Sequence, residues 1–312
     1  MFRFKMPDMT LPIREQAELL KEQFNSFIKS DALSDILSIL DTNLNGICVE
    51  YNGRVLKNGK VREIQEIGHN DSLDDYRNEL YPLFKELGLL GINKPLTNCH
   101  SHIIVLGGSF NSCHVRTSVV KDIIDDSTLF IDGLACYRPI NPVEKVNLSP
   151  NLSCDTEFAT MTEAFIHTFS LKNANVSEDF VSDRNINSIS NIRTFKTDGN
   201  LTYRIIAAPS GEPDKRRANT ADTLKFYMDN TTLDSTSSVV ATTNNLHCNR
   251  QFIQLTYEML KSGRTFNIDV VGCSSDDRIK TIDEYNPYQF VQELIATIDW
   301  INKFNDDSTT WN

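Results

Sequence analysis

The chain has 312 residues, which is enough to bury a large core in one domain or in two smaller ones. Its formal net charge is -11, from 42 acidic and 31 basic side chains, and it contains no long basic run. We therefore expect neither nucleic acid nor an anionic membrane surface as a partner. No apolar run approaches the roughly 18 residues that span a bilayer, and the first residues lack the apolar core of a signal peptide. These features predict a cytoplasmic protein.

Seven cysteines are scattered along the chain, and none of them forms a Cys-x-x-Cys motif. Their odd number and irregular spacing in a chain of this length favour reduced thiols over a disulfide framework. We expect all seven thiols to be free.

One cluster of cysteine and histidine residues has a spacing similar to that of zinc ligands. Its two halves lie at opposite ends of a strand predicted over 103–106, and five residues at about 3.3 Å each separate them by more than about 15 Å. Bonds to zinc are only about 2.0–2.3 Å long, so one tetrahedral site does not hold both halves. We expect no metal at this cluster, which consists of Cys99, His100, His102, Cys113 and His114.

Residues 1–95 carry mostly helical patterns and predict a helical cap or a small domain. Apolar residues recur at helical spacing over 13–42, which predicts two helices, and a further helix is expected over 73–87. Between them, residues 46–67 alternate in polarity and contain two Asn-Gly turns. One or two short strands, or a hairpin, are expected there.

Residues 96–312 alternate short apolar runs with helical segments, which predicts an α/β fold with a doubly wound, mostly parallel sheet of the Rossmann-like type. A hairpin is also expected between 192–197 and 202–208, through the turn Asp198-Gly199-Asn200. The strands are expected at 103–106, 129–132, 203–208, 238–243 and 267–272, and the helices at 113–126, 156–171, 219–229, 247–262 and 286–304.

The first predicted strand of this region ends on two glycines, Gly107 and Gly108. Ser109 and Asn111 follow as candidate N-caps of the next helix. A strand, a glycine turn and a helix start commonly hold an anionic or nucleotide-like ligand, because backbone amides and the positive helix end converge there. The pair of glycines is not the full Gly-x-Gly-x-x-Gly fingerprint, and such a turn can also serve only to bend the chain.

Ligands of open parallel sheets bind beyond the carboxyl ends of the strands, so the residues after each strand are the candidates. After 203–208, Asn219 or Thr220 can cap a helix and leave amides for an anion. After 238–243, His247 and Arg250 lie one helical turn apart. The imidazole of His247 can transfer a proton at this position, and the guanidinium of Arg250 can bind a carboxylate or phosphate group. A plain cap and a solvated helix start remain the alternatives.

Taken in order, these motifs resemble the YdcF/SanA/ElyC-like family, a widespread bacterial domain with a Rossmann-like sheet. The resemblance covers roughly residues 100–275, and residues 1–95 have no counterpart in it. The matching segments are Val105-Leu106-Gly107-Gly108, Ile131-Asp132-Gly133 through Tyr137-Arg138-Pro139, Thr156-Glu157, Asn219-Thr220 with Asp222, and Val239–Thr243 followed by His247-Cys248-Asn249-Arg250.

The resemblance implies a fold and a site more firmly than it implies a reaction, because the chemistry of the family is poorly defined. It implies a nucleotide-like ligand, and S-adenosylmethionine is the one suspected for soluble members. Members such as SanA and ElyC are tied to the membrane and envelope, whereas this chain shows no such anchor.

Three hypotheses follow from the sequence. The chain is an enzyme that uses a nucleotide-like or phosphorylated small molecule, a ligand-sensing module without turnover, or a structural protein with a vestigial crevice. In the first case His247 and Glu157 are the catalytic candidates. The predicted ligand-binding residues are Gly107, Gly108, Ser109, Asn111, Arg138, Asn219, Thr220, Asp222, Thr243, Asn244 and Arg250.

Overall fold

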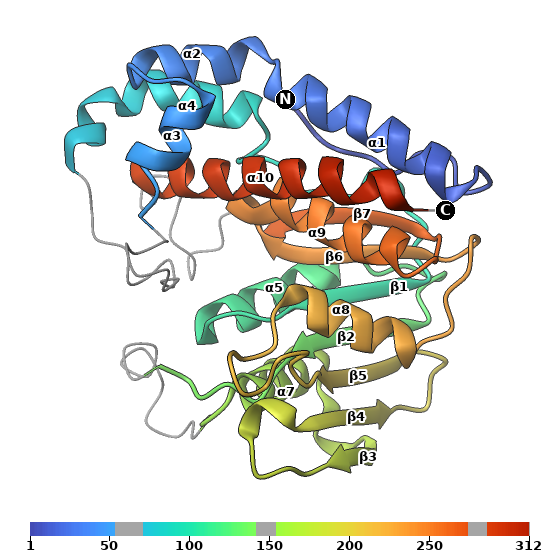
Figure 1. Ribbon diagram of the computed structural model, residues 1–312. Coiled ribbons are helices and arrows are strands. Elements are labelled where there is room, and N and C mark those ends of the chain that lie inside the picture. The colour runs from blue at the N-terminus through green and yellow to red at the C-terminus, as the bar shows by residue number, and fades with distance from the viewer. Residues whose placement is uncertain (54–70, 142–153, 274–285, 312) are drawn as a thin grey trace.

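The computed structural model describes residues 1–53, 71–141, 154–273 and 286–311. The described residues form a mixed sheet of seven strands in the order β3-β4-β5-β2-β1-β6-β7, with helices on both faces (Figure 1). This confirms the predicted α/β fold with a mostly parallel sheet. The strands are β1 (His102–Leu106), β2 (Phe130–Ala135), β3 (Asn175–Val181), β4 (Ser190–Lys196), β5 (Thr202–Ala207), β6 (Ser238–Asn244) and β7 (Asn267–Cys273).

The strand order changes direction next to β1. The chain runs from β1 to β2 and β5 on one side of β1, and then crosses to β6 and β7 on the other side. These strands are mutually parallel, so their carboxyl ends share one edge of the sheet. Val105 of β1 is in register with Thr242 of β6, and Leu106 of β1 with Leu134 of β2. The turns that follow β1, β2 and β6 are therefore neighbours.

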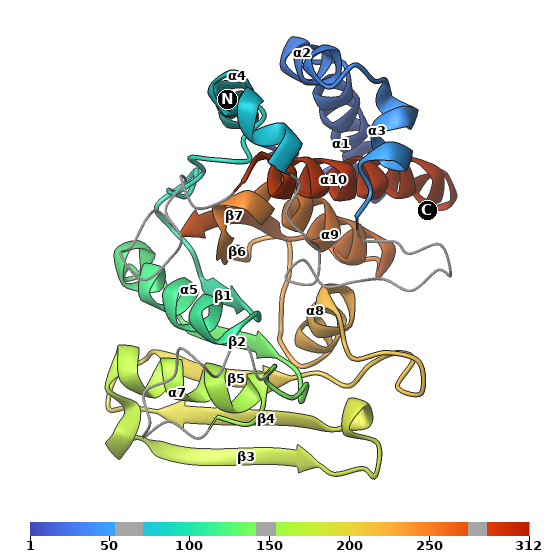
Figure 2. The ribbon, with the colours of Figure 1, turned by 90° about the vertical axis from the view of Figure 1, so that its left-hand side faces the viewer.

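Helices α5 and α7 cover one face of the sheet, and α8 and α9 cover the other (Figure 2). Side chains of β1 alternate between two apolar cores. Ile103 and Val105 pack with α5 and α7, whereas Ile104 and Leu106 pack with α8 and α9. Burial on both faces explains why these strands appear in the sequence as continuous apolar runs. The helices are α5 (Phe110–Ile123), α7 (Glu157–Phe169), α8 (Thr220–Asp229), α9 (Cys248–Lys261) and α10 (Pro287–Asp307).

The N-terminal region is helical, and it packs on α10, which lies outside α9 (Figure 1). The rings of Phe24 and Phe304 meet edge to face with centroids 4.9 Å apart, and Phe84 stacks on Phe290 at 4.8 Å. Among the helices of the described residues, none is both long and apolar enough to cross a bilayer. The domain boundary between 1–95 and 96–312 stays a prediction. The helices are α1 (Ile13–Ile28), α2 (Asp31–Ile39), α3 (Leu44–Glu50), a short 3-10 helix (Asp71–Tyr76) and α4 (Arg77–Glu86).

The strand or hairpin predicted over 46–67 is wrong for the part that the structure describes, because Leu44–Glu50 forms α3. Asn43 caps this helix, and its side-chain oxygen accepts hydrogen bonds from the amides of Asn45 at 3.0 Å and Gly46 at 2.9 Å. The cap provides the local reason for a helix start at this point. Residues 54–67 of the prediction lie outside the described residues.

The hairpin expected before 203–208 is confirmed, since β4 and β5 pair in antiparallel register. Strand β3 was not predicted. Every residue of β3 is exposed, so its sequence carries no alternation between apolar and polar side chains. Its antiparallel pairing with β4 holds it in the sheet.

A buried ion pair joins β2 to β5 and to the end of α8. Arg204 Nε donates to Asp132 Oδ1 at 2.6 Å, and Arg204 Nη2 donates to Oδ2 at 2.8 Å. Asp132 is 0% exposed, so this carboxylate depends on the guanidinium for compensation. Arg204 Nη1 also donates to the carbonyl of Asn230 at 3.1 Å, just beyond α8.

Breaking this pair from one side will be costly. We expect Asp132→Ala to lower the free energy of unfolding by about 3–5 kcal/mol, because it leaves a largely buried guanidinium without its carboxylate. Lys225→Gln, which removes an exposed partner of Asp229, is the control and should change stability by about 0.5 kcal/mol or less. Urea unfolding of both variants measures the difference, and equal midpoints would contradict the role of the pair.

Candidate functional site

A cavity of about 60 Å³ lies at the carboxyl ends of β1 and β2, between the N-termini of α7 and α8. One water molecule needs roughly 10–15 Å³ of such space, so the cavity has room for a single small polar or anionic group. The residues that matter most in its lining are Gly107, Cys136, Glu157, Arg217, Asn219 and Thr220.

The glycine turn after β1 is tightly enclosed by the protein's own groups. A Cβ atom on Gly107 would lie 2.6 Å from the carbonyl oxygen of Leu134 and 2.6 Å from Glu157 Oε1. A Cβ atom on Gly108 would lie 2.9 Å from Ser112 Cβ. The absence of side chains therefore lets the Glu157 carboxylate approach the backbone of the turn.

Glu157 is the first residue of α7, and it is 5% exposed. Its Oε2 accepts hydrogen bonds from the amide of Cys136 at 3.2 Å and from the Cys136 thiol at 3.0 Å, and its Oε1 lies 3.7 Å from Arg138 Nε. Burial raises the pKa of the Cys136 thiol, and the negative charge of Glu157 raises it further. The thiol therefore remains protonated and acts as a donor to the carboxylate.

Two arginines hold the glycine turn through its carbonyl groups. Arg116 of α5 donates to the carbonyl of Leu106 at 2.8 Å and to that of Gly107, and its Nε donates to Asn244 Oδ1 at 3.0 Å. Arg138 Nη2 donates to the carbonyl of Gly108 at 2.5 Å. Arg116 is 5% exposed and connects the end of β1 to the end of β6. Arg116 could not be recognised from the sequence because it lies inside a helical pattern and belongs to no motif.

The helix that follows the glycine turn begins at the predicted cap. Ser109 Oγ accepts a hydrogen bond from the amide of Ser112 at 3.4 Å, so Ser109 caps α5. The other candidate, Asn111, lies inside the first turn of α5 and is exposed. The first amides of any α-helix have no acceptor within the helix, which leaves the start of α5 suited to an anion.

A reciprocal capping box at the start of α8 satisfies two backbone amides, those of Asn219 and Asp222. Asn219 Oδ1 accepts from the amide of Asp222 at 3.1 Å, and Asp222 Oδ2 accepts from the amide of Asn219 at 2.9 Å. Asp222 also accepts from Arg216 and from the amide of Gly211. Asp222 was predicted to bind ligand, but its carboxylate is occupied by these protein groups.

His247 and Arg250 both contact the carboxylate of Glu293, a residue that was not predicted from the sequence. His247 Nδ1 lies 3.0 Å from Glu293 Oε2, and Arg250 Nε donates to Glu293 Oε1. Glu293 belongs to α10 and is 0% exposed. Burial lowers the pKa of His247 below its ordinary 6.5, although the charge of Glu293 opposes that shift. The carboxylate partner expected for Arg250 is thus supplied by the chain itself.

The structure divides the predicted site residues into two groups along one edge of the sheet. Around the cavity lie Gly107, Glu157, Asn219 and Thr220, with Gly108, Ser109 and Arg138 beside them. Near the end of β6 lie Thr243, Asn244, His247 and Arg250. Arg116 contacts both groups, so they are neighbours. That they form one ligand site stays a prediction.

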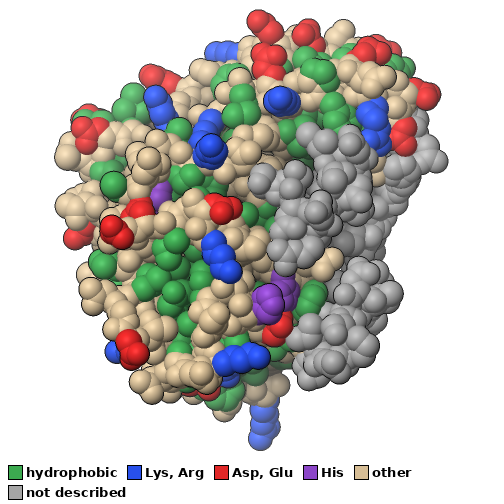
Figure 3. All heavy atoms as spheres, turned by 180° about the vertical axis from the view of Figure 1, so that it is seen from behind, with side chains coloured by type: hydrophobic (Ala, Val, Ile, Leu, Met, Phe, Trp, Pro, Cys, Tyr) green, Lys and Arg blue, Asp and Glu red, His purple; other side chains and the backbone are tan. Residues whose placement is uncertain are grey.

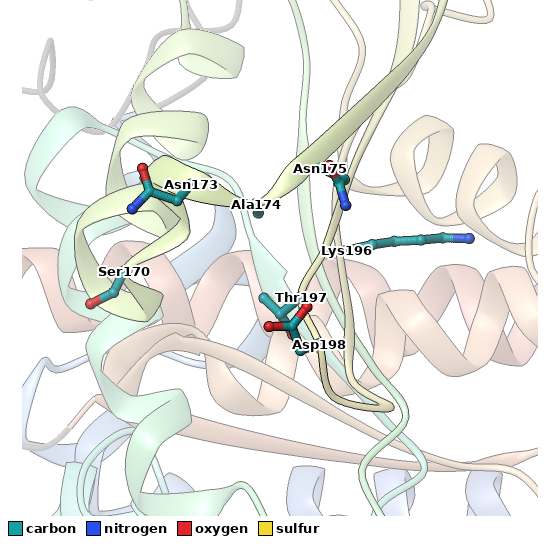
Figure 4. Close-up of a pocket in the computed structure, with 7 residues that line it drawn as sticks. All are labelled: Ser170, Asn173, Ala174, Asn175, Lys196, Thr197 and Asp198. Carbon is teal, nitrogen blue, oxygen red and sulfur yellow. The ribbon is translucent and has the colours of Figure 1, made fainter.

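A second cavity, of about 190 Å³, lies at the opposite edge of the sheet, near the end of β4. Its polar side chains do not converge, since that of Lys196 extends away from those of Ser170 and Asn173 (Figure 4). Acidic and basic side chains are interspersed over the described part of the face that carries α5 and α7 (Figure 3). Within the described residues, no group of three or more His, Cys, Asp or Glu side chains is placed to hold a metal ion.

The role of Asp222 as a cap has a pH signature. Burial favours the protonated carboxyl, but hydrogen bonds from Arg216 and from the amides of Asn219 and Gly211 outweigh it, so the pKa of Asp222 lies below its ordinary 3.8. A lowered folded-state pKa contributes stability above the unfolded-state pKa, and that stability is lost as the pH falls through the folded-state value.

We therefore expect Asp222→Asn to destabilise the fold by about 1–2 kcal/mol near neutral pH. The difference from the unsubstituted chain should shrink below about pH 4. Asp229→Asn, at the exposed far end of α8, is the control and should cost about 0.5 kcal/mol or less. Urea unfolding across this pH range measures both, and a gap that is independent of pH would contradict the assignment.

The prediction that all seven cysteines are free is confirmed, and the cysteines differ sharply in exposure. Cys99 is exposed, whereas Cys136 is buried with a raised pKa. Since the thiolate is the reactive form, iodoacetamide at about pH 8 should label Cys99 readily and leave Cys136 unmodified until the protein unfolds. Peptide mass spectrometry measures both sites in the same sample, and rapid labelling of Cys136 would contradict the protonated thiol.

No protein-family model, curated protein or solved structure matches this chain. The resemblance to the YdcF/SanA/ElyC-like family therefore stays a prediction, which depends on the order of short motifs over residues 100–275.

Proposed function

We propose that this chain binds a small phosphorylated or nucleotide-like molecule at the carboxyl edge of its sheet. The observation that carries the proposal is the cavity beside the switch in strand order, which is lined by the start of α8 and by Arg217, whose positive charge acts on Cys136 in the same lining. A helix N-terminus and a guanidinium both favour a phosphate or carboxylate group. In a chain of net charge -11, this local combination is suited to an anionic group.

The opposite wall of the cavity supplies an acceptor. Glu157 offers a carboxylate for a hydroxyl or amino group, while Arg217 and the start of α8 take the anionic group. A ligand that carries both kinds of group fits this arrangement, and phosphorylated sugars, nucleotides and S-adenosylmethionine are examples. Because the cavity holds only one such group, the rest of the molecule must lie outside it, along the edge of the sheet.

Two functional outcomes follow from binding at this place. An enzyme would use Glu157 and His247 for proton transfer, since both lie at the same edge. A ligand-sensing module without turnover is the second candidate, and Glu293 gives it a route from the site to the N-terminal helices. This residue joins His247 and Arg250 to α10, on which the N-terminal helices pack. The free thiols suit a reducing compartment, so we place either function in the cytoplasm.

Substitution of Thr220 tests the proposed site without disturbing the helix. Thr220 is the first residue of α8. The helix dipole stabilises an acidic side chain at this position, so the Thr220→Glu variant should fold normally. The added negative charge should weaken binding of an anionic ligand by about tenfold or more, which corresponds to about 1.4 kcal/mol. The neutral control, Thr220→Gln, should retain the affinity within about threefold.

Thermal-shift and calorimetric titrations with inorganic phosphate, AMP, glucose 6-phosphate and S-adenosylmethionine measure these affinities. A ligand at about 100 times its dissociation constant should stabilise the unsubstituted chain by about 2.7 kcal/mol. The proposal fails if none of these ligands shifts the transition, or if the one that binds has equal affinity for the Glu and Gln variants.

A further inference from the structure

The two ring nitrogens of His247 lie in different surroundings. Its Nδ1 is inaccessible to solvent and lies 3.0 Å from Glu293 Oε2, an ion-pair contact in which the two atoms do not meet in hydrogen-bond geometry. Its Nε2 has no hydrogen-bond partner among the described residues, and the side chain as a whole is 15% exposed. One ring nitrogen thus faces a buried carboxylate, whereas the other is available at the carboxyl edge of the sheet.

The carboxylate of Glu293 is held in place from two sides. Arg250 Nε donates to Oε1, while His247 Nδ1 approaches Oε2. Arg250 Nη1 also donates to Gln254 Oε1 at 3.1 Å, which fixes the guanidinium along α9. A carboxylate with 0% exposure needs such compensation, since a buried charge that loses its partners costs several kcal/mol.

The charged groups around the imidazole come from three helices. Glu293 of α10 favours the protonated ring, whereas Arg250 of α9 and Arg116 of α5 disfavour it. Burial also favours the neutral ring. The neutral form needs one proton on a ring nitrogen, and the nitrogen that faces a carboxylate is the one that keeps it.

We propose that Glu293 is a positioning residue that keeps the proton of His247 on Nδ1, so that Nε2 presents a bare lone pair at the carboxyl edge of the sheet. The inference rests on the proposed function, because the partner of Nε2 is a hydroxyl or amino group of the bound molecule, or a water molecule beside it. Nε2 takes the proton from that group, and Glu293 stabilises the imidazolium that forms. The proton returns from Nε2 to that group or to the water molecule when the bound molecule leaves, so no other reactant is needed.

Nuclear magnetic resonance of the full chain with ¹⁵N-labelled histidine tests this inference without any ligand. The expected tautomer of His247 in the unsubstituted chain has hydrogen on Nδ1 and a bare Nε2. Glu293→Gln keeps an acceptor but removes the charge, so the pKa of His247 should fall further. Arg250→Met removes a positive charge, so the pKa should rise. A merely structural contact would not give shifts of opposite sign.

His100 is the internal control in the same spectra, because its two ring nitrogens contact Ser238 Oγ and the carbonyl of Thr97 instead. Its signals should be unchanged in both variants. Hydrogen on Nε2 of His247, or a pKa that does not fall in Glu293→Gln, would overturn the inference. If that variant does not fold, the tautomer of the unsubstituted chain and the Arg250→Met titration still decide the question.

The same samples separate this inference from the proposed function. Phosphate, AMP and S-adenosylmethionine are titrated into the unsubstituted chain while the signals of His247 are followed. If no ligand binds but the tautomer is as expected, the proposed function fails and the role of Glu293 stands. If a ligand binds but the tautomer is reversed, the proposed function stands and the role of Glu293 fails.

Discussion

The site depends on how the chain is held together just beyond the carboxyl ends of the paired strands β1 and β6. At this point the connection after β1 leaves toward one face of the sheet as α5, and the connection after β6 leaves toward the other face as α9. Because the two connections diverge, a crevice forms between them at the strand ends. The guanidinium of Arg116 lies in this crevice and donates hydrogen bonds to the carbonyls of Leu106 and Gly107 and to the side chain of Asn244. One buried cation therefore fixes the relative position of the glycine turn and the end of β6.

Three buried carboxylates among the described residues each lie against an arginine side chain. Asp132 pairs with Arg204 in the sheet, and Glu293 pairs with Arg250 between α9 and α10. Glu157 lies near Arg138 at the cavity. The first two pairs join elements that are distant in the sequence, and each pair requires good geometry because removing a charge from water is costly. The carboxyl edge is therefore held by directional contacts as well as by apolar packing.

The sequence predicted the central strands well because they are buried on both faces. Their side chains alternate between two apolar cores, so the runs at 103–106 and 238–243 are continuous and bounded by polar residues. Strand β3 escaped prediction because it is exposed on both faces. The segment after Asn43 was assigned to strands because its alternation resembled that of a hairpin, whereas a side-chain cap starts a helix there.

Site residues that follow a strand directly could be predicted from the sequence, since the edge of a parallel sheet gathers them. Their chemical partners could not. Glu293 is 43 positions from Arg250, and no local pattern connects the two. The cap at Asn219 was recognised, but a capping carboxylate and a ligand-binding carboxylate have the same sequence signature, so the role of Asp222 needed coordinates.

The open edge of β3 has a consequence for how copies of this protein behave in solution. Within the described residues no strand pairs with the outer side of β3, so this edge presents backbone groups that can pair with another strand. Glu178 and Asp179 occupy the middle of this strand, between exposed apolar residues at its ends. Charged side chains in the middle of an edge strand oppose growth of the sheet from one molecule into the next.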